Sequence, residues 1–168
     1  MSSATPTDPS GPAVLLRPAL AEDGPAIGAL YTATRIAAVP LMPPALHTAE
    51  EDVAYFSALI VDAEHECWVA EQDGEIAAFA MLTETWLDGL YVHPSAQGQG
   101  IGTALLELAQ SLRPSGLGLW VFESNTPGRE LYRRHGFVET EHTDGSGNEE
   151  HAPDIRMDWP GPPDGTIG

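Results

Sequence analysis

The stretch Gln97–Thr103, QGQGIGT, decides how the fold of this chain is read. It follows the apolar run LYVHPSA (90–96), and from Gly100 onward apolar residues recur at helical spacing on one face. The stretch is therefore predicted to be a glycine-rich turn from a strand into a helix. The first amides of a helix lack internal partners and carry partial positive charge, and glycine lets an anion approach the backbone closely. The turn is a candidate anion-binding loop.

Two common nucleotide-binding signatures are absent from this stretch. The P-loop pattern GxxxxGK[ST] needs a lysine, and the chain contains none. The dinucleotide pattern GxGxxG also fails, because its sixth position falls on Thr103 or Leu105. No basic side chain lies between Arg35 and Arg113, so backbone amides and polar groups would have to hold the anion. A tight turn without a ligand is the alternative interpretation.

Around this stretch, hydrophobic periodicity and turn residues predict one mixed α/β domain over residues 13–159. The expected strands are 13–18, the two runs on either side of Asp73-Gly74, 85–94, 117–123, and the runs FVETEHT and DIRMDW. The expected helices are 22–38, a segment behind the capping box of Thr48 and Glu51, a segment from Gly100 to Pro114, and 126–136 with Thr126 as its N-cap.

This order, β-α-α-β-β-β-α-β-α-β-β, describes a single α/β domain with hairpins and not a doubly wound sheet. Residues 1–12 and 160–168 are rich in Ser, Thr, Pro and Gly, and both segments are expected to be disordered tails.

A second motif, NTPGRELYRRHGF (125–137), lies downstream of the glycine-rich stretch. The spacing Gln97-x-x-Gly100-x-Gly102 after a strand ending in LYVHP resembles the acyl-CoA loop of the GNAT superfamily of N-acetyltransferases. Residues 125–137 are similar to that family's second block, an Asn followed by a helix that carries Leu-Tyr and ends in Gly-Phe. The resemblance covers nearly the whole domain, and the hairpin at 144–154 resembles that of a bacterial subset. Gly128 departs from the pattern, since the family often has Ala there.

The resemblance implies a mixed, mostly antiparallel sheet of the α+β type, splayed between its fourth and fifth strands and flanked by helices. The pantetheine arm of acetyl-CoA would lie in the splay, and the loop amides would hold its pyrophosphate. The residues implied to bind acetyl-CoA, as co-substrate, are Leu90, Tyr91, Val92, Gln97, Gly98, Gln99, Gly100, Ile101, Gly102, Thr103, Asn125 and Tyr132. The amide of Val92 would also stabilise the oxyanion.

Acetyl transfer to an amine requires a base, because an alkyl ammonium with a pKa of about 10.4 is almost fully protonated at neutral pH. Asp88, two residues before Leu90, is the favoured base. Glu84, Glu123 or water remain alternatives, and Asp88 is equally explained as a solvent-facing carboxylate. Tyr132 is the expected acid for the leaving thiolate, since a phenol with a pKa of about 10 stays protonated. A tyrosine that only packs the core is the alternative.

The amino-acid composition limits the kinds of partner that the chain is expected to bind. The chain has 25 acidic and 7 basic residues, a net charge of -18, which argues against binding nucleic acid or an anionic membrane surface. The same charge would attract a cationic substrate, or it serves only solubility. The single cysteine, Cys67, excludes an intrachain disulfide, and the histidines show no metal-ligand spacing, so no metal is expected. The first residues resemble no signal peptide, so a cytoplasmic protein is expected.

Together these features predict an acetyl-CoA-dependent N-acetyltransferase. It would transfer acetyl directly to a primary amine of a small, cationic molecule or of a peptide. The alternative is a non-catalytic acyl-CoA-binding module that serves as a sensor or partner subunit. The sequence does not identify the amine or the oligomeric state, and a homodimer remains open.

Overall fold

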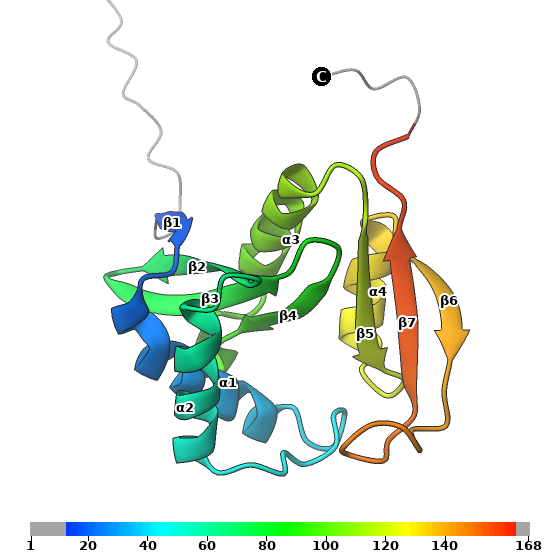
Figure 1. The fold of residues 1–168 in the computed structure, drawn as a ribbon, viewed down its shortest axis with the longest axis horizontal. Helices are drawn as coiled ribbons and strands as arrows, with labels where there is room; N and C mark the ends of the chain where they lie inside the picture. The colour runs from blue at the N-terminus through cyan, green and yellow to red at the C-terminus, as the bar shows by residue number, and fades with distance from the viewer. Residues whose placement is uncertain (1–12, 164–168) are drawn as a thin grey trace, which may run out of the picture.

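A computed structural model describes residues 13–163, which form two sheets that diverge from one another (Figure 1). The first is antiparallel, in the order β1-β2-β3-β4, and the second is antiparallel, in the order β5-β7-β6. The strands are β1 (Val14–Pro18), β2 (Glu66–Gln72), β3 (Glu75–Leu82), β4 (Leu87–Val92), β5 (Leu117–Phe122), β6 (Val138–His142) and β7 (Asp154–Trp159). The helices are α1 (Gly24–Ala37), α2 (Ala49–Ile60), α3 (Ile101–Leu112) and α4 (Thr126–Arg134), with short 3-10 turns η1 (Ala21–Asp23) and η2 (Pro94–Ala96).

The predicted order of elements is confirmed, and the local signals explain several boundaries. Asp73 and Gly74 both adopt positive φ, as a tight turn between β2 and β3 requires. Thr48 and Glu51 form the predicted capping box at the start of α2, with Glu51 N donating to Thr48 Oγ1 over 3.1 Å.

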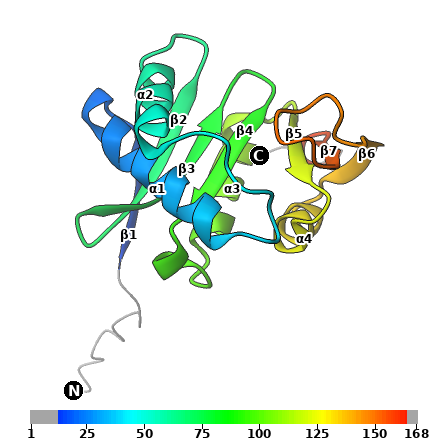
Figure 2. The same ribbon diagram turned by 90° about the horizontal axis from the view of Figure 1, so that it is seen from below.

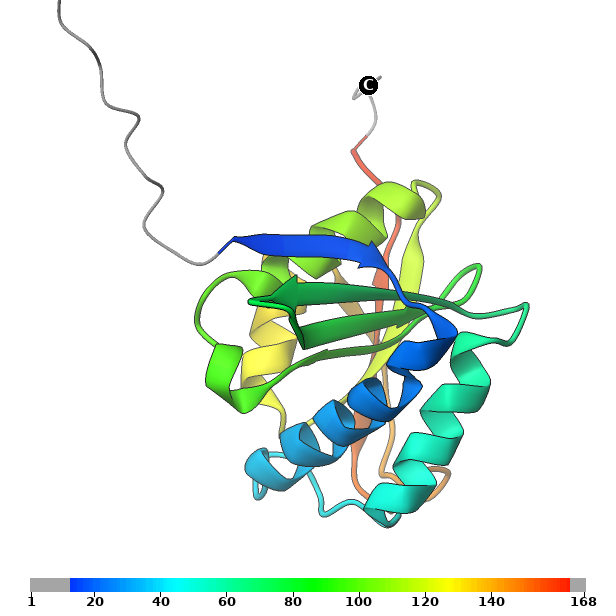
Figure 3. The same ribbon diagram turned by 90° about the vertical axis from the view of Figure 1, so that its left-hand side faces the viewer.

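Helices cover both faces of the first sheet (Figure 3). Alternate residues of β3 face opposite sides, so Phe79 and Met81 pack with α1 and α2, while Ala78, Ala80 and Leu82 pack with α3. The core on the α3 side continues into the three-stranded sheet, where it includes Phe137 and Met157. The molecule is thus held together by one core that spans both sheets and a second core beneath α1 and α2.

The splay between β4 and β5 is confirmed, and it has a closed end and an open end. At the closed end, Trp86 forms a parallel bridge with Gly118, and Gly118 N donates to Thr85 O over 2.9 Å. A side chain at Gly118 would come within 2.8 Å of the Trp86 ring, so a glycine is needed for this close approach. Beyond this point the two strands separate, and no ladder joins them in the part of the chain that is described.

The structure differs from the prediction at the start of α4 and in the C-terminal segment. The N-cap of α4 is Asn125 and not Thr126, because the Asn125 side chain accepts a hydrogen bond from Gly128 N over 3.2 Å. The predicted tail at 1–12 lies outside the described residues, as does 164–168. Of the rest of the predicted C-terminal tail, 160–163 are placed, with Gly161 buried against Pro114.

Replacing Asp23 by alanine should lower the free energy of unfolding by about 1–3 kcal/mol near neutral pH. The nearly buried Asp23 carboxylate accepts from Arg17 and from Leu20 N, and the hydrogen bond from Arg17 holds the pKa of Asp23 below its usual value. A depressed pKa stabilises the fold above the ordinary carboxyl range, and this contribution is lost as the pH falls through the folded-state value. Denaturant unfolding should therefore show the gap between wild type and variant narrowing toward pH 3.

The matched control is Glu22→Ala, an exposed acid in the same turn. A gap for Asp23→Ala that is independent of pH would contradict this account of Asp23.

Candidate acyl-CoA site

The open end of the splay forms a cleft of about 690 Å³. Its walls come from β4, β5, the loop and first turn of α3, α4, and the end of α1, so it joins segments distant in sequence. Of the sequence-predicted site residues, those that line the cleft are Asp88, Leu90, Tyr91, Val92, Gln97, Gly98, Gly100, Ile101, Gly102, Thr103, Asn125 and Tyr132. Gln99 is the exception; its exposed side chain accepts a hydrogen bond from Gln72 over 2.9 Å.

The glycine-rich stretch adopts the conformation that an anion cradle requires. Gly98 and Gly100 have φ of +80° and +81°, and a side chain at either would meet nothing within 4 Å. Gly100 caps α3, so the unpaired amides of the first turn face the cleft that Ile101, Gly102 and Thr103 line. The backbone of this loop is therefore not covered by side chains, and its conformation suits an anion that is bound by amides.

The free edge of β4 faces the splay. His93 N donates to Ala77 O on β3, and antiparallel pairing alternates, so the backbone groups of Leu90 and Val92 point to the opposite, unpaired edge. These are the positions expected to bond the pantetheine amides. The Val92 carbonyl accepts a hydrogen bond from the Gln97 side chain over 3.1 Å. The unpaired backbone groups of β4 therefore suit an extended ligand that carries amides, such as a pantetheine arm.

The start of α4 forms the opposite wall of the cleft. Asn125 Oδ1 is occupied by the cap, so its amide nitrogen is the atom left to contact a ligand. Gly128 lies in the first turn directly below, where a Cβ would come within 2.7 Å of the Asn125 amide nitrogen. The glycine that departs from the family pattern thus leaves room for the Asn125 side chain.

Tyr132 is half-buried on α4, packs edge-to-face against Phe137 at 5.7 Å between ring centroids, and lines the cleft. Burial raises the pKa of Tyr132 to about 12, so the phenol remains protonated throughout the physiological range. Within residues 13–163 its hydroxyl makes no hydrogen bond, which leaves it able to donate to a ligand.

Asp88 lies in a β-bulge at the mouth of the cleft. Met81 pairs with Gly89 and Leu82 with Leu87, so Asp88 is the extra, unpaired residue of β4. A bulge redirects a side chain from the regular alternation of a strand. The carboxylate, whose side chain is 42% exposed, lies 3.4 Å from His65 Nε2. Loss of hydration raises the pKa of Asp88, and His65 opposes that shift.

The alternative bases lie elsewhere. Glu84 and Glu123 are exposed and are not among the described residues that line the cleft. Asp154, at the start of β7, does line it, and its carboxylate accepts from the Thr143 hydroxyl. The architecture implied by the resemblance puts the hairpin Asp144–Asp154 beside the acceptor, where its acids would attract a cationic amine, and Asp154 is the acid of that hairpin that lines the cleft.

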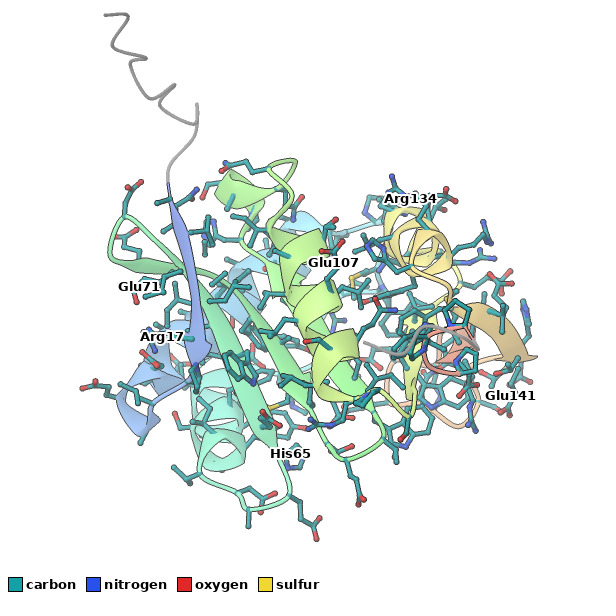
Figure 4. The ribbon with its side chains drawn as sticks, turned by 90° about the horizontal axis from the view of Figure 1, so that it is seen from above. Arg17, His65, Glu71, Glu107, Arg134 and Glu141 are labelled. Carbon is teal, nitrogen blue, oxygen red and sulfur yellow. The ribbon has the colours of Figure 1, made fainter. Side chains whose placement is uncertain are left out.

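Trp120 and Arg134 also line the cleft. The sequence pattern gives no reason to place Trp120 there, whereas Arg134 is one of three arginines on α4 that would either attract a phosphate of CoA or simply suit the negative C-terminus of the helix. Trp120 is 45% exposed although β5 was read as a buried strand, and it lines the cleft. Arg134, at the end of α4 (Figure 4), also lines the cleft and has no carboxylate partner among residues 13–163, whereas Arg129 and Arg133 both pair with Glu139. Trp86, which the family resemblance would place beside the acceptor, instead packs beneath Arg156 in a separate hollow.

The segment 38–48 between α1 and α2 runs from the first sheet toward the second (Figures 1 and 2). Leu41 and Met42 of this segment line the cleft, and the Leu41 carbonyl accepts from the Ser124 hydroxyl. His47 Nε2 lies 2.7 Å from a Glu149 carboxylate oxygen in the β6–β7 loop. The segment thus walls the end of the cleft that lies away from the glycine loop.

The structure contains neither a metal-binding group of three or more His, Cys, Asp or Glu residues nor a helix long and apolar enough to cross a membrane, within the residues described.

Comparison with known proteins agrees with this geometry. Residues 63–139 match the family model of the acetyltransferase (GNAT) domain. Over 78 residues the chain is 41% identical to the peptidyl-lysine N-acetyltransferase YjaB of Salmonella typhimurium, a match covering 46% of this chain and 53% of that protein. It is 36% identical over 76 residues to the peptidyl-lysine N-acetyltransferase YiaC of Escherichia coli, covering 45% and 51%. The matched segment spans about half the length of each relative.

Solved structures extend the likeness to nearly the whole chain. The apo form of YjaB from Escherichia coli superposes with a TM-score of 0.70 at 22% identity, covering 89% of this chain and 99% of that one. A GCN5-related N-acetyltransferase from Rhodopseudomonas palustris superposes with a TM-score of 0.72 at 25% identity, covering 90% and 96%. The family match, the splayed sheet and the glycine loop agree: residues 63–139 match the acetyltransferase (GNAT) domain, and the described residues share the fold of solved GNAT acetyltransferases.

Proposed function

We propose that this protein is an acetyl-CoA-dependent N-acetyltransferase that transfers acetyl directly to a primary amine. The observation that carries the proposal is the convergence of four features on one cleft: the uncovered glycine loop, the free edge of β4, Asp88 and Tyr132. The amine is that of a small, cationic molecule or of a peptide. The curated relatives are named for acetylation of peptidyl lysine, which supports the peptide class.

The glycine loop would hold the pyrophosphate of acetyl-CoA through the first amides of α3, and the edge groups of Leu90 and Val92 would bond the pantetheine arm. Arg134 is the basic side chain of the cleft that has no acidic partner among the described residues, so it is available to a phosphate of the nucleotide. Acetyl-CoA supplies the activated acetyl group, and the protein positions its thioester near Tyr132.

Asp88 would accept the proton of the substrate ammonium, either directly or through a water molecule. The amide of Val92 would stabilise the negative charge that develops on the thioester oxygen. Tyr132 would donate its proton to the leaving thiolate and regain one from the acetylated nitrogen. One proton per turnover is then released to solvent through the base.

The far end of the cleft combines apolar walls with carboxylates. Leu41, Met42 and Trp120 would contact the hydrocarbon part of the acceptor, and Asp88 and Asp154 would attract its positive charge. The net charge of -18 favours the approach of a cation from any direction. Both features suit an amine on an alkyl stem, as in a polyamine or a lysine side chain.

The proposal is tested by titrating acetyl-CoA calorimetrically and then following thiol release with a panel of polyamines, aminoglycosides and lysine-containing peptides. We expect saturable binding and amine-dependent thiol release, with acetylated amine formed in equal amount. Binding without turnover on every amine would favour a non-catalytic acyl-CoA-binding module. Absence of binding would exclude both functions.

A further inference from the structure

An acid–histidine–acid chain leads from the mouth of the cleft to the surface. His65 lies in the loop between α2 and β2, below the ends of the strands of the first sheet (Figure 4). Its Nδ1 is 2.6 Å from Asp62 Oδ2, and its Nε2 is 3.4 Å from Asp88 Oδ2. The exposed fractions of these side chains are 19% for His65, 46% for Asp62 and 42% for Asp88. The imidazole is therefore the shielded link between two partly hydrated carboxylates.

The hydrogen bond between His65 and Asp62 orients the imidazole ring. Nδ1 contacts Asp62 and Nε2 faces Asp88, so one ring nitrogen can exchange a proton with Asp88 while the other is hydrogen-bonded to Asp62. A group able to exchange a proton thus faces the carboxyl group that is expected to receive the substrate's proton.

No other charged group competes for His65 among residues 13–163. Glu66, next in sequence on β2, is engaged by Arg113 and by the indole N–H of Trp68. Glu64 is exposed and makes no contact with the ring. The charged groups that face the imidazole, from the α2–β2 loop and from β4, are Asp62 and Asp88.

We propose that His65 carries the substrate's proton from Asp88 to solvent, and that Asp62 is the positioning residue that orients its ring. The proposal rests on the proposed function, since it assumes that Asp88 is the base. The ammonium loses a proton to the Asp88 carboxylate, and Asp88 passes it to His65 Nε2. The resulting imidazolium lies between two carboxylates and releases the proton to water, which restores the neutral ring and the ionised base. No bond other than those to the proton changes in this step.

The test compares His65→Gln, which keeps hydrogen-bonding groups but transfers no proton, with wild type. We expect kcat to fall roughly 100-fold, with unchanged affinity for acetyl-CoA and unchanged thermal stability. In His65→Ala, added imidazole should restore part of the lost rate. Asp62→Asn should give a smaller loss. The matched control is His142→Gln, an exposed histidine that pairs with Glu139 away from the cleft, and it should keep the wild-type rate.

A second readout does not depend on turnover. Because His65 lowers the pKa of Asp88, the Asp88 carboxyl signal followed by NMR should titrate at higher pH in His65→Gln than in wild type. Equal kcat for His65→Gln and wild type, or an unchanged Asp88 titration, would overturn the relay. A wild-type protein that acetylates no amine would instead overturn the proposed function, and the Asp88 titration would still decide whether the two groups are coupled.

Discussion

Replacing Gly100 by valine should weaken acetyl-CoA binding by about tenfold or more, equal to at least ~1.4 kcal/mol. Gly100 caps α3 at φ +81°, a conformation that costs an ordinary residue about 1–2 kcal/mol and a β-branched residue more. The loop would relieve that strain by turning away, and the first amides of α3 would no longer converge on one point. Calorimetric titration of acetyl-CoA measures the change directly.

The matched control is Gly74→Val. Gly74 has φ +79° and equally open surroundings, but it lies in the β2–β3 turn away from the cleft. It should lose comparable stability and keep the wild-type affinity. Arg134→Ala should weaken binding less than Gly100→Val, since the loop is expected to bind through amides. Equal affinity of Gly100→Val and Gly74→Val for acetyl-CoA would show that the glycine loop does not bind acetyl-CoA.

Tyr132→Phe should lower kcat by roughly 100-fold or more, the usual contribution of a positioned general acid. The affinity for acetyl-CoA should hardly change, because the ring would still pack against Phe137. With the pKa of Tyr132 raised to about 12, the phenol of the wild type stays protonated, so kcat should show no alkaline decline from Tyr132 below about pH 10. Steady-state kinetics over pH checks both expectations.

Tyr55→Phe serves as the control, since Tyr55 is exposed on α2 and removed from the cleft. A Tyr132→Phe enzyme with wild-type kcat would exclude Tyr132 as the acid and leave water as the proton donor.

Local sequence signals sufficed for most of the fold. Apolar spacing after Gly100, the Asp73-Gly74 turn and the capping box at Thr48 each act within a few residues, and all three are present as predicted. The error at the start of α4 has a local cause as well. Asn125 and Thr126 are both good N-cap residues, and the choice depends on which side chain reaches Gly128 N.

What the sequence could not supply depends on distant contacts. The apolar pattern of β5 predicts a buried Trp120, but Trp120 is 45% exposed and lines the cleft where β4 and β5 separate. The contact between His65 and Asp88 joins residues on either side of the β2–β3 hairpin, and Asp88 makes it from the bulge in β4. The splay itself is inferred from the family resemblance, because the spacing of apolar residues in β4 and β5 does not indicate it.

The most direct test of the central claim is an NMR titration of backbone amides with acetyl-CoA. If the splayed cleft is the acyl-CoA site, the largest shifts should fall on Gly98 to Thr103, on the edge amides of Leu90 and Val92, and on Asn125. Saturable binding that instead shifts residues of the hollow around Trp86 and Trp159, leaving the loop amides unchanged, would contradict the account.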